Sequence, residues 1–387
     1  MTDIVRYSFP TAVRFGAGAR HMLPAVLSEA AVRRPLFVTD RGVAELPWFA
    51  ELVASVAGDH ATATFSGVWG NPVVSQVDAG AVAARTHDAD AIVAVGGGAA
   101  LDVAKAIALM QRHPGHLFDY EDGKPDARPV DQPLPYLVAL PTTAGTGSEV
   151  GRSAVVSDDA THAKKIIFDP RLLARVVLAD PELTLGLPAA LTAATGVDAL
   201  THLVEAFLAR GHHPMCDGIA LEGVRLVAEH LEDAVRFAAE GGDPAAHLAA
   251  RTGMLDASMM GAVAFQKGLG VNHSCAHALS TVCDTHHGRA NALMLPTCMR
   301  FNLSAVPERF ERLAATVGAA DGPGFIAWIE ALLERVGLAV SLDAEGVPRA
   351  ALDRLVIVAL ADGCHPSNPR PVSAQDLRAL FTEAFGA

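Results

Sequence analysis

The sequence of 387 residues lacks three features that would each point to a particular class of protein. It has no Cys-x-x-Cys pair, and its five cysteines are scattered, so no disulfide framework is indicated and reduced thiols in a cytoplasm are expected. It has no basic excess, because 30 Lys and Arg stand against 43 Asp and Glu, which argues against nucleic acid or an anionic membrane as the main partner. No apolar run approaches the roughly 20 residues that span a bilayer, and the first residues lack the blocks of a secretory signal. We therefore expect a soluble cytoplasmic protein whose ligands are small molecules.

What is present describes a well-buried globular chain, with 51% hydrophobic and 19% charged residues. The length exceeds one ordinary core, so two domains are expected. In the first half, strand-like apolar runs alternate with helical periodicity, which predicts a mostly parallel sheet covered by helices. These runs are PLFVTD (35–40), ATATFSG (61–67), AIVAVGGG (91–98), PYLVALPTTAG (135–145) and RVVLAD (175–180).

From Pro188 onward the apolar spacing is helical and no convincing strand is present. The sequence thus predicts an α/β dinucleotide-binding domain over residues 1–187 and an all-α domain over 188–387. Breaks between the helices are predicted where turn-forming residues gather, at residues 211–215, 240–244, 320–324 and 363–371.

Three glycines, Gly96–Gly98, lie between a buried strand and a helix that begins near Ala99. Backbone amides at a helix start can approach a pyrophosphate where no Cβ intervenes, and the helix dipole favours its charge. The pattern is not the G-x-G-x-x-G fingerprint, so a simple tight turn is the alternative. On the first turns of this helix, Asp102 could cap amides or touch a ribose hydroxyl, and Lys105 is expected to be a solvated charge.

A second loop, PTTAGTGSEV (141–150), also follows a strand and is rich in Thr, Gly and Ser. Its hydroxyls and amides suit a diphosphate or a ribose, although an ordinary Ser/Thr-rich turn is the competing interpretation. Asp40 ends the first clear strand. Its carboxylate could bond a ribose 2′-hydroxyl and repel a 2′-phosphate, which would favour NAD over NADP, or it could equally be the N-cap of the next helix.

Potential metal ligands stand in two groups along the second half. Asp198 and His202 are four residues apart in TAATGVDALTHLVEAFLA, a helical pattern, so both side chains leave the same face. His273 and His277 repeat this spacing, and His287 follows after a short break. Three imidazoles and one carboxylate suit Fe(II) or Zn(II) rather than calcium or magnesium, whereas the Asp–His pair alone is also common on ordinary helices.

At this point the residues resemble those of the iron-containing, or group III, alcohol dehydrogenases. The motifs that carry the resemblance occur in the family's order and cover nearly the whole chain: GGGAALDVAK (96–105), PTTAGTGSEV (141–150), ATGVDALTHLVEAF (194–207), AFQKGLGVNHSCAH (264–277), HHGRANALMLP (286–296) and NPRP (368–371). The resemblance implies an α/β nucleotide domain and a helical domain, similar to glycerol dehydrogenase and dehydroquinate synthase, with the active site between them and a homodimer as the assembly.

Carried over position by position, the resemblance assigns the metal ligands to Asp198, His202, His273 and His287. It places His277 beside the metal and the nicotinamide without making it a ligand. The implied cofactor positions are Asp40, Asn71, Gly97, Gly98, Thr142, Thr143, Thr146 and Lys164.

Some positions depart from the family's pattern. Ala99 stands where Ser is usual, which removes a hydroxyl near the phosphates but leaves the backbone donors. VNHSCAHALS replaces the usual V-H-x-x-A-H-P-L-G, and His286 replaces the usual Pro before the last ligand. These changes put the substrate in doubt more than the chemistry. We expect Phe265 and Cys364 to line the substrate pocket without a catalytic role.

The main hypothesis is an NAD-dependent, Fe(II)-activated oxidoreductase that interconverts a small alcohol and its aldehyde or ketone, with Zn(II) as a possible ion. The ion would stabilise the alkoxide, and His277 would relay the proton to solvent. Alternatives within the family are a maleylacetate reductase-type activity and a hydroxyacid–oxoacid transhydrogenase. From other classes, a dehydroquinate synthase-like lyase and a non-catalytic metal- or nucleotide-binding protein compete.

Overall fold

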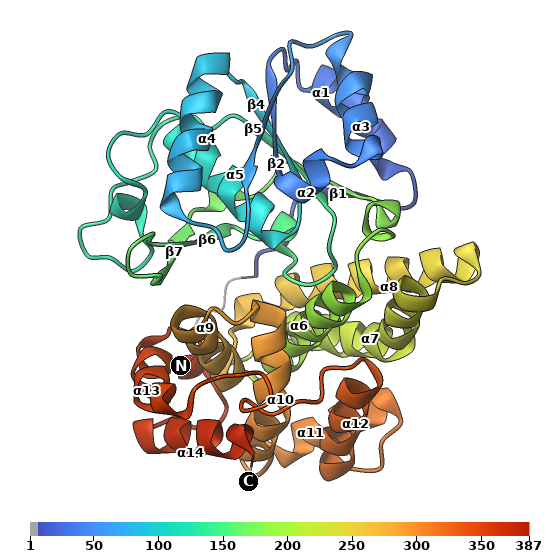
Figure 1. The fold of residues 1–387 in the computed structure, drawn as a ribbon, viewed down its shortest axis with the longest axis vertical. Coiled ribbons are helices and arrows are strands. Elements are labelled where there is room, and N and C mark those ends of the chain that lie inside the picture. The colour runs from blue at the N-terminus through green and yellow to red at the C-terminus, as the bar shows by residue number, and fades with distance from the viewer. Residues whose placement is uncertain (1–6, 387) are drawn as a thin grey trace. The chain divides into compact units, whose positions relative to one another are not determined.

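The computed structural model describes residues 7–386, which form two compact units (Figure 1). One unit contains residues 10–143 and 147–184. The other contains residues 185–386 together with the short segments 7–9 and 144–146. The first six residues, part of the segment on which the lack of a secretory signal was predicted, lie outside the described residues, as does residue 387.

The first unit is built on a six-stranded parallel sheet in the order β1-β8-β5-β4-β2-β3. The strands are β1 (Ala12–Phe15), β2 (Pro35–Asp40), β3 (Ala63–Val68), β4 (Ala91–Gly96), β5 (Tyr136–Pro141) and β8 (Val176–Ala179). Its α-helices are α1 (Leu23–Glu29), α2 (Arg41–Ala44), α3 (Pro47–Ala57), α4 (Val74–His87) and α5 (Gly98–Met110). All five predicted strands are present.

The sheet is covered on both faces, which explains why its central strands are almost continuously apolar. Phe37, Val93 and Val138 face a core shared with α1 and α3, and Figure 1 shows α4 and α5 on the other side of the sheet. The strand order reverses between β2 and β4, so Asp40 and Gly96 end neighbouring strands at the point where ligands gather in such sheets.

Three strands were not predicted. β1 is a four-residue strand at the edge of the sheet, and three of its four residues are exposed. β6 (Ser153–Ser157) and β7 (Lys164–Phe168) form a separate antiparallel pair. Their mixed polar and apolar sequence carries little of the buried apolar character that marked the central strands.

The second unit is helical, and the described residues from Pro188 onward contain no strand, as predicted. Its helices are α6 (Ala189–Leu208), α7 (Pro214–Glu240), α8 (Pro244–Ala264), α9 (Val271–Cys283), α10 (His287–Leu303), α11 (Pro307–Val317), α12 (Gly322–Arg335), α13 (Leu352–Ala361) and α14 (Ala374–Phe385). Each predicted break overlaps a gap between two helices, although three of the four ranges include helix ends. Further breaks separate α8 from α9, which carries His273 and His277, and α9 from α10, which begins at His287.

The five cysteines are all described and carry free thiols. Within residues 7–386, no helix has both the length and the apolar character needed to cross a bilayer.

Candidate active site

The three-glycine segment forms the turn between β4 and α5. Gly96 has φ +149°, and a Cβ there would lie 2.6 Å from the Cβ of Ala100, so a side chain is excluded on both counts. Gly97 is the N-cap of α5, and no side chain caps the helix. The first backbone N–H groups of this 13-residue helix therefore have no side-chain cap, and their binding of a phosphate stays a prediction.

The Thr-rich loop follows β5, the neighbour of β4 in the sheet, and contacts the glycine turn. The backbone N–H of Thr142 donates to the carbonyl of Gly96 at 3.0 Å. A Cβ on Gly97 would lie 3.1 Å from Cγ2 of Thr143, so the absence of a side chain at Gly97 leaves room for the threonine. The two loops predicted to hold the dinucleotide thus lie side by side at the sheet edge.

Lys105 is not a solvated charge, contrary to the sequence-based expectation, because its side chain is buried under the loop. Its Nζ donates to Ser148 Oγ at 2.7 Å and to the carbonyl of Ser153 at 2.8 Å. Burial lowers the pKa of Lys105, although the neighbouring carboxylates of Asp102 and Glu149 oppose the shift. The expectation failed because a lysine within a helix gives no sign that a distant loop will cover it.

Asp102 takes part in the same network. Its Oδ1 accepts from the Ser148 hydroxyl, and its Oδ2 accepts from the N–H of Val155 at 2.9 Å. Both oxygens therefore bind α5 to the loop and to β6. A contact between Asp102 and the cofactor stays a prediction.

Asp40 caps a helix, which is one of the two roles predicted for it. Its Oδ1 accepts from the N–H of Val43 at 2.9 Å, at the start of α2. Its Oδ2 faces the glycine turn, since a Cβ on Gly96 would lie 3.1 Å from it. The carboxylate is thus held beside the turn.

Asn71 and Lys164 come together through the β6–β7 pair. Ser157 pairs with Lys164 in the sheet, and its N–H donates to the carbonyl of Pro72 at 2.8 Å, next to Asn71. Asn71 is exposed and Lys164 is half-buried. Thr146, the remaining predicted cofactor residue, belongs with residues 144–146 to the helical unit.

In the helical unit, Asp198, His273 and His287 are brought together from α6, α9 and α10. Each offers a ligand atom within 4.8 Å of the other two. The Oδ1 of Asp198 is 3.4 Å from Nε2 of His287 and 3.9 Å from Nε2 of His273. Asp198 and His273 are buried, and Nε2 of His273 has no hydrogen-bond partner among the described residues. A buried imidazole nitrogen without a partner, facing a carboxylate, fits a site for a divalent ion.

His202 adjoins this group without being part of it. Its ring stacks on that of His273 with the centroids 4.6 Å apart, and its Nδ1 has no hydrogen-bond partner among the described residues. Its ring also hydrogen-bonds with the backbone of Gly145. Burial lowers the pKa of His202 to about 4. The ring is therefore neutral at physiological pH, which is the form that binds metal. Phe265, expected near the substrate, lies with its ring centroid 5.2 Å from that of His202.

Two buried residues that sequence reasoning missed support this group. Glu205 accepts from the ring of His273, whose Nδ1 lies 2.6 Å from Oε2. Asn291 donates from Nδ2 to Asp198 Oδ1 at 2.6 Å. Periodicity could have found both, because Glu205 follows His202 by three residues and Asn291 follows His287 by four, each on the same helix face.

Glu205 also changes the ionisation of His273. Burial opposes charging of the ring, but the hydrogen bond and the charge of Glu205 outweigh burial and raise the pKa of His273.

His277 lies one helical turn from His273 and pairs with Asp362. Its Nδ1 is 2.8 Å from Asp362 Oδ2, and Ser274 Oγ donates to the other oxygen at 2.7 Å. Burial would raise the pKa of Asp362, but the hydrogen bonds from His277 and Ser274 hold it well below its usual range. Burial raises the pKa of the thiol of Cys364, in the same loop, well above its ordinary value.

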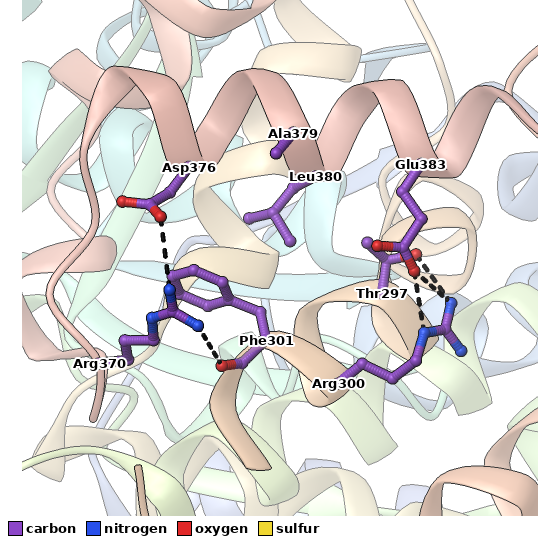
Figure 2. Close-up of a pocket in the computed structure, with 8 residues that line it drawn as sticks. All are labelled: Thr297, Arg300, Phe301, Arg370, Asp376, Ala379, Leu380 and Glu383. Atoms are coloured by element: carbon purple, nitrogen blue, oxygen red, sulfur yellow. Dashed lines mark hydrogen bonds and ion pairs between the residues drawn. The ribbon is translucent and has the colours of Figure 1, made fainter. Parts of the chain in front are cut away.

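A cavity of about 300 Å³ in the helical unit holds none of the predicted site residues (Figure 2). It lies between α10 and α14, and its charged groups pair with one another. Arg300 bonds Glu383 at 2.9 Å, and Arg370 lies over the ring of Phe301 with Asp376 3.6 Å away. Because these charges are already paired, the cavity offers no reactive group.

Comparison with known proteins gives a consistent result over the whole chain. The model of a family described as iron-containing alcohol dehydrogenase matches residues 10–181, and a model of the C-terminal part of that family matches residues 192–385. A 4-hydroxybutyrate dehydrogenase from Cupriavidus necator is 38% identical over 388 residues, covering 97% of this chain and 98% of that protein.

Solved structures agree with this result. A 1,3-propanediol oxidoreductase matches with a TM-score of 0.92 and 35% identity, covering 99% of this chain and 100% of that chain. A sulfoacetaldehyde reductase from Bifidobacterium kashiwanohense in complex with NAD+ matches with a TM-score of 0.90 and 28% identity, each chain being fully covered.

Proposed function

Since the chain belongs to the iron-containing alcohol dehydrogenase family and is an oxidoreductase that interconverts an alcohol and its carbonyl partner, we propose that it works with NAD(H) and a divalent ion. Asp198, His202, His273 and His287 would hold the ion. Fe(II) is the ion that the family suggests, and Zn(II) suits the same donors.

One observation carries the metal site: Asp198, His273 and His287 place ligand atoms within 4.8 Å of one another. Nε2 of His273 is buried without a hydrogen-bond partner among the described residues, a cost that a bound ion would offset. A divalent ion there supplies Lewis acidity, which lowers the pKa of an alcohol hydroxyl and polarises a carbonyl.

The residues of the helical unit prepare this chemistry by their burial and ionisation. The lowered pKa of His202 keeps a neutral ring available at neutral pH, and the hydrogen bond from Asn291 leaves Asp198 oriented toward His287. Phe265, against His202, provides an apolar wall that excludes water from one side.

The α/β unit holds the dinucleotide, which supplies the hydride acceptor. The uncapped start of α5 at Gly97 and Gly98 suits the diphosphate, with Thr142 and Thr143 as further donors and Asn71, Asp102 and Lys164 as additional contacts. Thr146, which belongs to the helical unit, is proposed as a further contact. Asp40 faces the same turn, and its negative charge favours NAD over NADP.

His277 handles the proton. Its Nδ1 is hydrogen-bonded to Asp362, so Nε2 is the atom that accepts or returns a proton. The ring stacks on that of the proposed ligand His287 with centroids 5.2 Å apart, which supports a role beside the metal site.

The substrate class is a small primary alcohol and its aldehyde. The relatives act on 4-hydroxybutyrate and on 1,3-propanediol, which are short chains with a terminal hydroxyl and a second polar end. We also expect a cytoplasmic enzyme, in keeping with the five free thiols. A homodimer is supported by the open edge of β1, where Val13 and Phe15 are each 37% exposed.

An NADH-coupled screen tests the proposal. Protein purified without oxygen and supplied with Fe(II) is assayed with short aldehydes, diols and hydroxyacids, and NADH oxidation with at least one short aldehyde is the expected result. Turnover with two organic substrates and no added NAD would identify a transhydrogenase instead, and activity confined to maleylacetate would identify that reductase. Unchanged nicotinamide absorbance across the whole panel would contradict the proposal.

A further inference from the structure

A continuous chain of hydrogen bonds joins the two most buried of the proposed ligands. Every residue in this chain is buried. Asp198 and His273 are 2% and 1% exposed, and Glu205, Asn272 and Asn291 behind them are 2%, 0% and 0% exposed. These residues come from α6, α9 and α10, which pack against one another in the helical unit (Figure 1).

At one end of the chain, Glu205 binds His273 through one carboxylate oxygen and Asn272 through the other. Oε2 accepts from the ring Nδ1 at 2.6 Å and from the backbone N–H of His273 at 3.2 Å, while Oε1 accepts from the N–H of Asn272 at 2.7 Å. A ring that donates from Nδ1 to a carboxylate carries its lone pair on Nε2. Nε2 is also the ring atom that faces Asp198, at 3.9 Å from Oδ1.

At the other end, two side-chain amides fix Asp198. Asn272 donates from Nδ2 to Asn291 Oδ1 at 2.9 Å, and Asn291 donates from Nδ2 to Asp198 Oδ1 at 2.6 Å. Gly270 is required for this arrangement, because a Cβ there would lie 2.6 Å from Glu205 Oε1.

We infer that Glu205 and Asn291 are positioning residues that orient His273 and Asp198 and thereby set how tightly the site retains its divalent ion. The inference rests on the proposed metal site. Ligands that are already oriented lose less freedom when the ion binds, and outer partners of this kind typically contribute 10- to 100-fold in metal affinity.

Zn(II) affinity, measured on the full chain by competition with a chromophoric chelator, tests the inference. Glu205→Gln keeps the shape of the side chain but can no longer accept from both Asn272 and His273, so we expect Zn(II) binding to weaken at least 10-fold. Asn291→Ala removes the donor to Asp198, and weaker binding is expected again. Glu222→Gln is the matched control, since Glu222 is a half-exposed helical carboxylate on α7 that bonds Arg225. The Zn(II) affinity of Glu222→Gln should stay within twofold of that of wild type.

Co(II) binding provides a second measurement, whose result would not change if the role of Glu205 were purely structural. Its visible absorption reports the coordination geometry, and we expect the spectrum to differ in Glu205→Gln but not in Glu222→Gln. If Glu205→Gln fails to fold, as judged by far-ultraviolet circular dichroism, Asn291→Ala decides the question. Wild-type affinity in the folded variants, or a lower melting temperature of the metal-free protein with unchanged affinity, would overturn the inference. Wild-type protein that binds no Zn(II) would overturn the metal site and the inference with it.

Discussion

One oxygen of the Asp40 carboxylate caps α2, and the other faces the glycine turn, where a ribose contact is proposed. The sequence left these two roles open as alternatives, and the structure shows the cap directly. Both roles are compatible, since the cap uses only Oδ1.

A pair of substitutions separates the two roles of Asp40. Asp40→Asn keeps an oxygen that can accept from Val43 but removes the charge, so we expect the kcat/KM ratio of NADPH to NADH to rise about tenfold without loss of stability. Asp40→Ala removes the cap as well, which should also cost about 1 kcal/mol in the free energy of unfolding. Coenzyme kinetics and urea denaturation measure the two effects. Equal use of NADH and NADPH by wild type would refute the proposed repulsion.

His277 is the residue whose loss should affect the rate without affecting the ion. Its ring nitrogen is held by Asp362, and the proposed ligands are other residues. We expect His277→Gln to lower kcat about 100-fold, which is within the usual range for lost proton transfer, while the metal content stays that of wild type. Loss of the metal together with the activity would make His277 a ligand instead of a proton carrier.

At the scale of elements, the start of α5 shows which features a sequence pattern can predict and which it cannot. The three glycines predicted the turn, and the positive φ of Gly96 explains why glycine is needed there. The burial of Lys105 and the β6–β7 pair could not be predicted, because both depend on residues 148–168 folding back onto α5. Local periodicity carries no information about such a distant contact.

A side chain on Gly97 should block the cradle at the start of α5. In Gly97→Val, the Cβ would stand 3.1 Å from Thr143, and the two methyl groups would fill the space beside the open amides. We expect the dissociation constant of NAD to rise at least tenfold, as measured by isothermal titration calorimetry. Gly58→Ala is the control, because nothing lies within 4 Å of a Cβ at Gly58. An unchanged NAD affinity in Gly97→Val would show that the dinucleotide does not bind at this turn.

At the scale of the whole molecule, the sequence predicted the two fold classes and the helix breaks because these depend on long, strongly periodic segments. The resemblance assigned four metal ligands, and the structure brings three of them, Asp198, His273 and His287, together. Glu205 and Asn291 were missed because a carboxylate and an amide on a helix are usually solvated. Only the packing of α6, α9 and α10 shows that both are buried behind the ligands.

The stability of the metal-free protein should depend on pH through Glu149, which is buried with Oε1 unpaired. Burial raises the pKa of Glu149 from 4.5 to about 7. Because the folded pKa is raised, the stability that the protonated side chain contributes is complete below the unfolded pKa and is lost as the pH rises through 7. His202 acts in the opposite sense, since burial lowers its pKa to about 4 and its contribution is lost as the pH falls.

Two variants separate the contribution of Glu149 to the pH dependence of stability from that of His202. Relative to wild type, Glu149→Gln should gain up to about 3 kcal/mol in the free energy of unfolding between pH 5 and pH 8, as followed by urea denaturation. The exposed Glu51→Gln should show no such gain. A difference between Glu149→Gln and wild type that does not change with pH would mean that Glu149 is ionised throughout.

The metal content of protein purified without oxygen is the most direct test of the central claim that Asp198 and the three histidines bind one divalent ion. Elemental analysis of wild type should give one iron or zinc per chain, and His273→Ala should give almost none while still binding NAD. Wild-type amounts of metal in folded His273→Ala would contradict the claim.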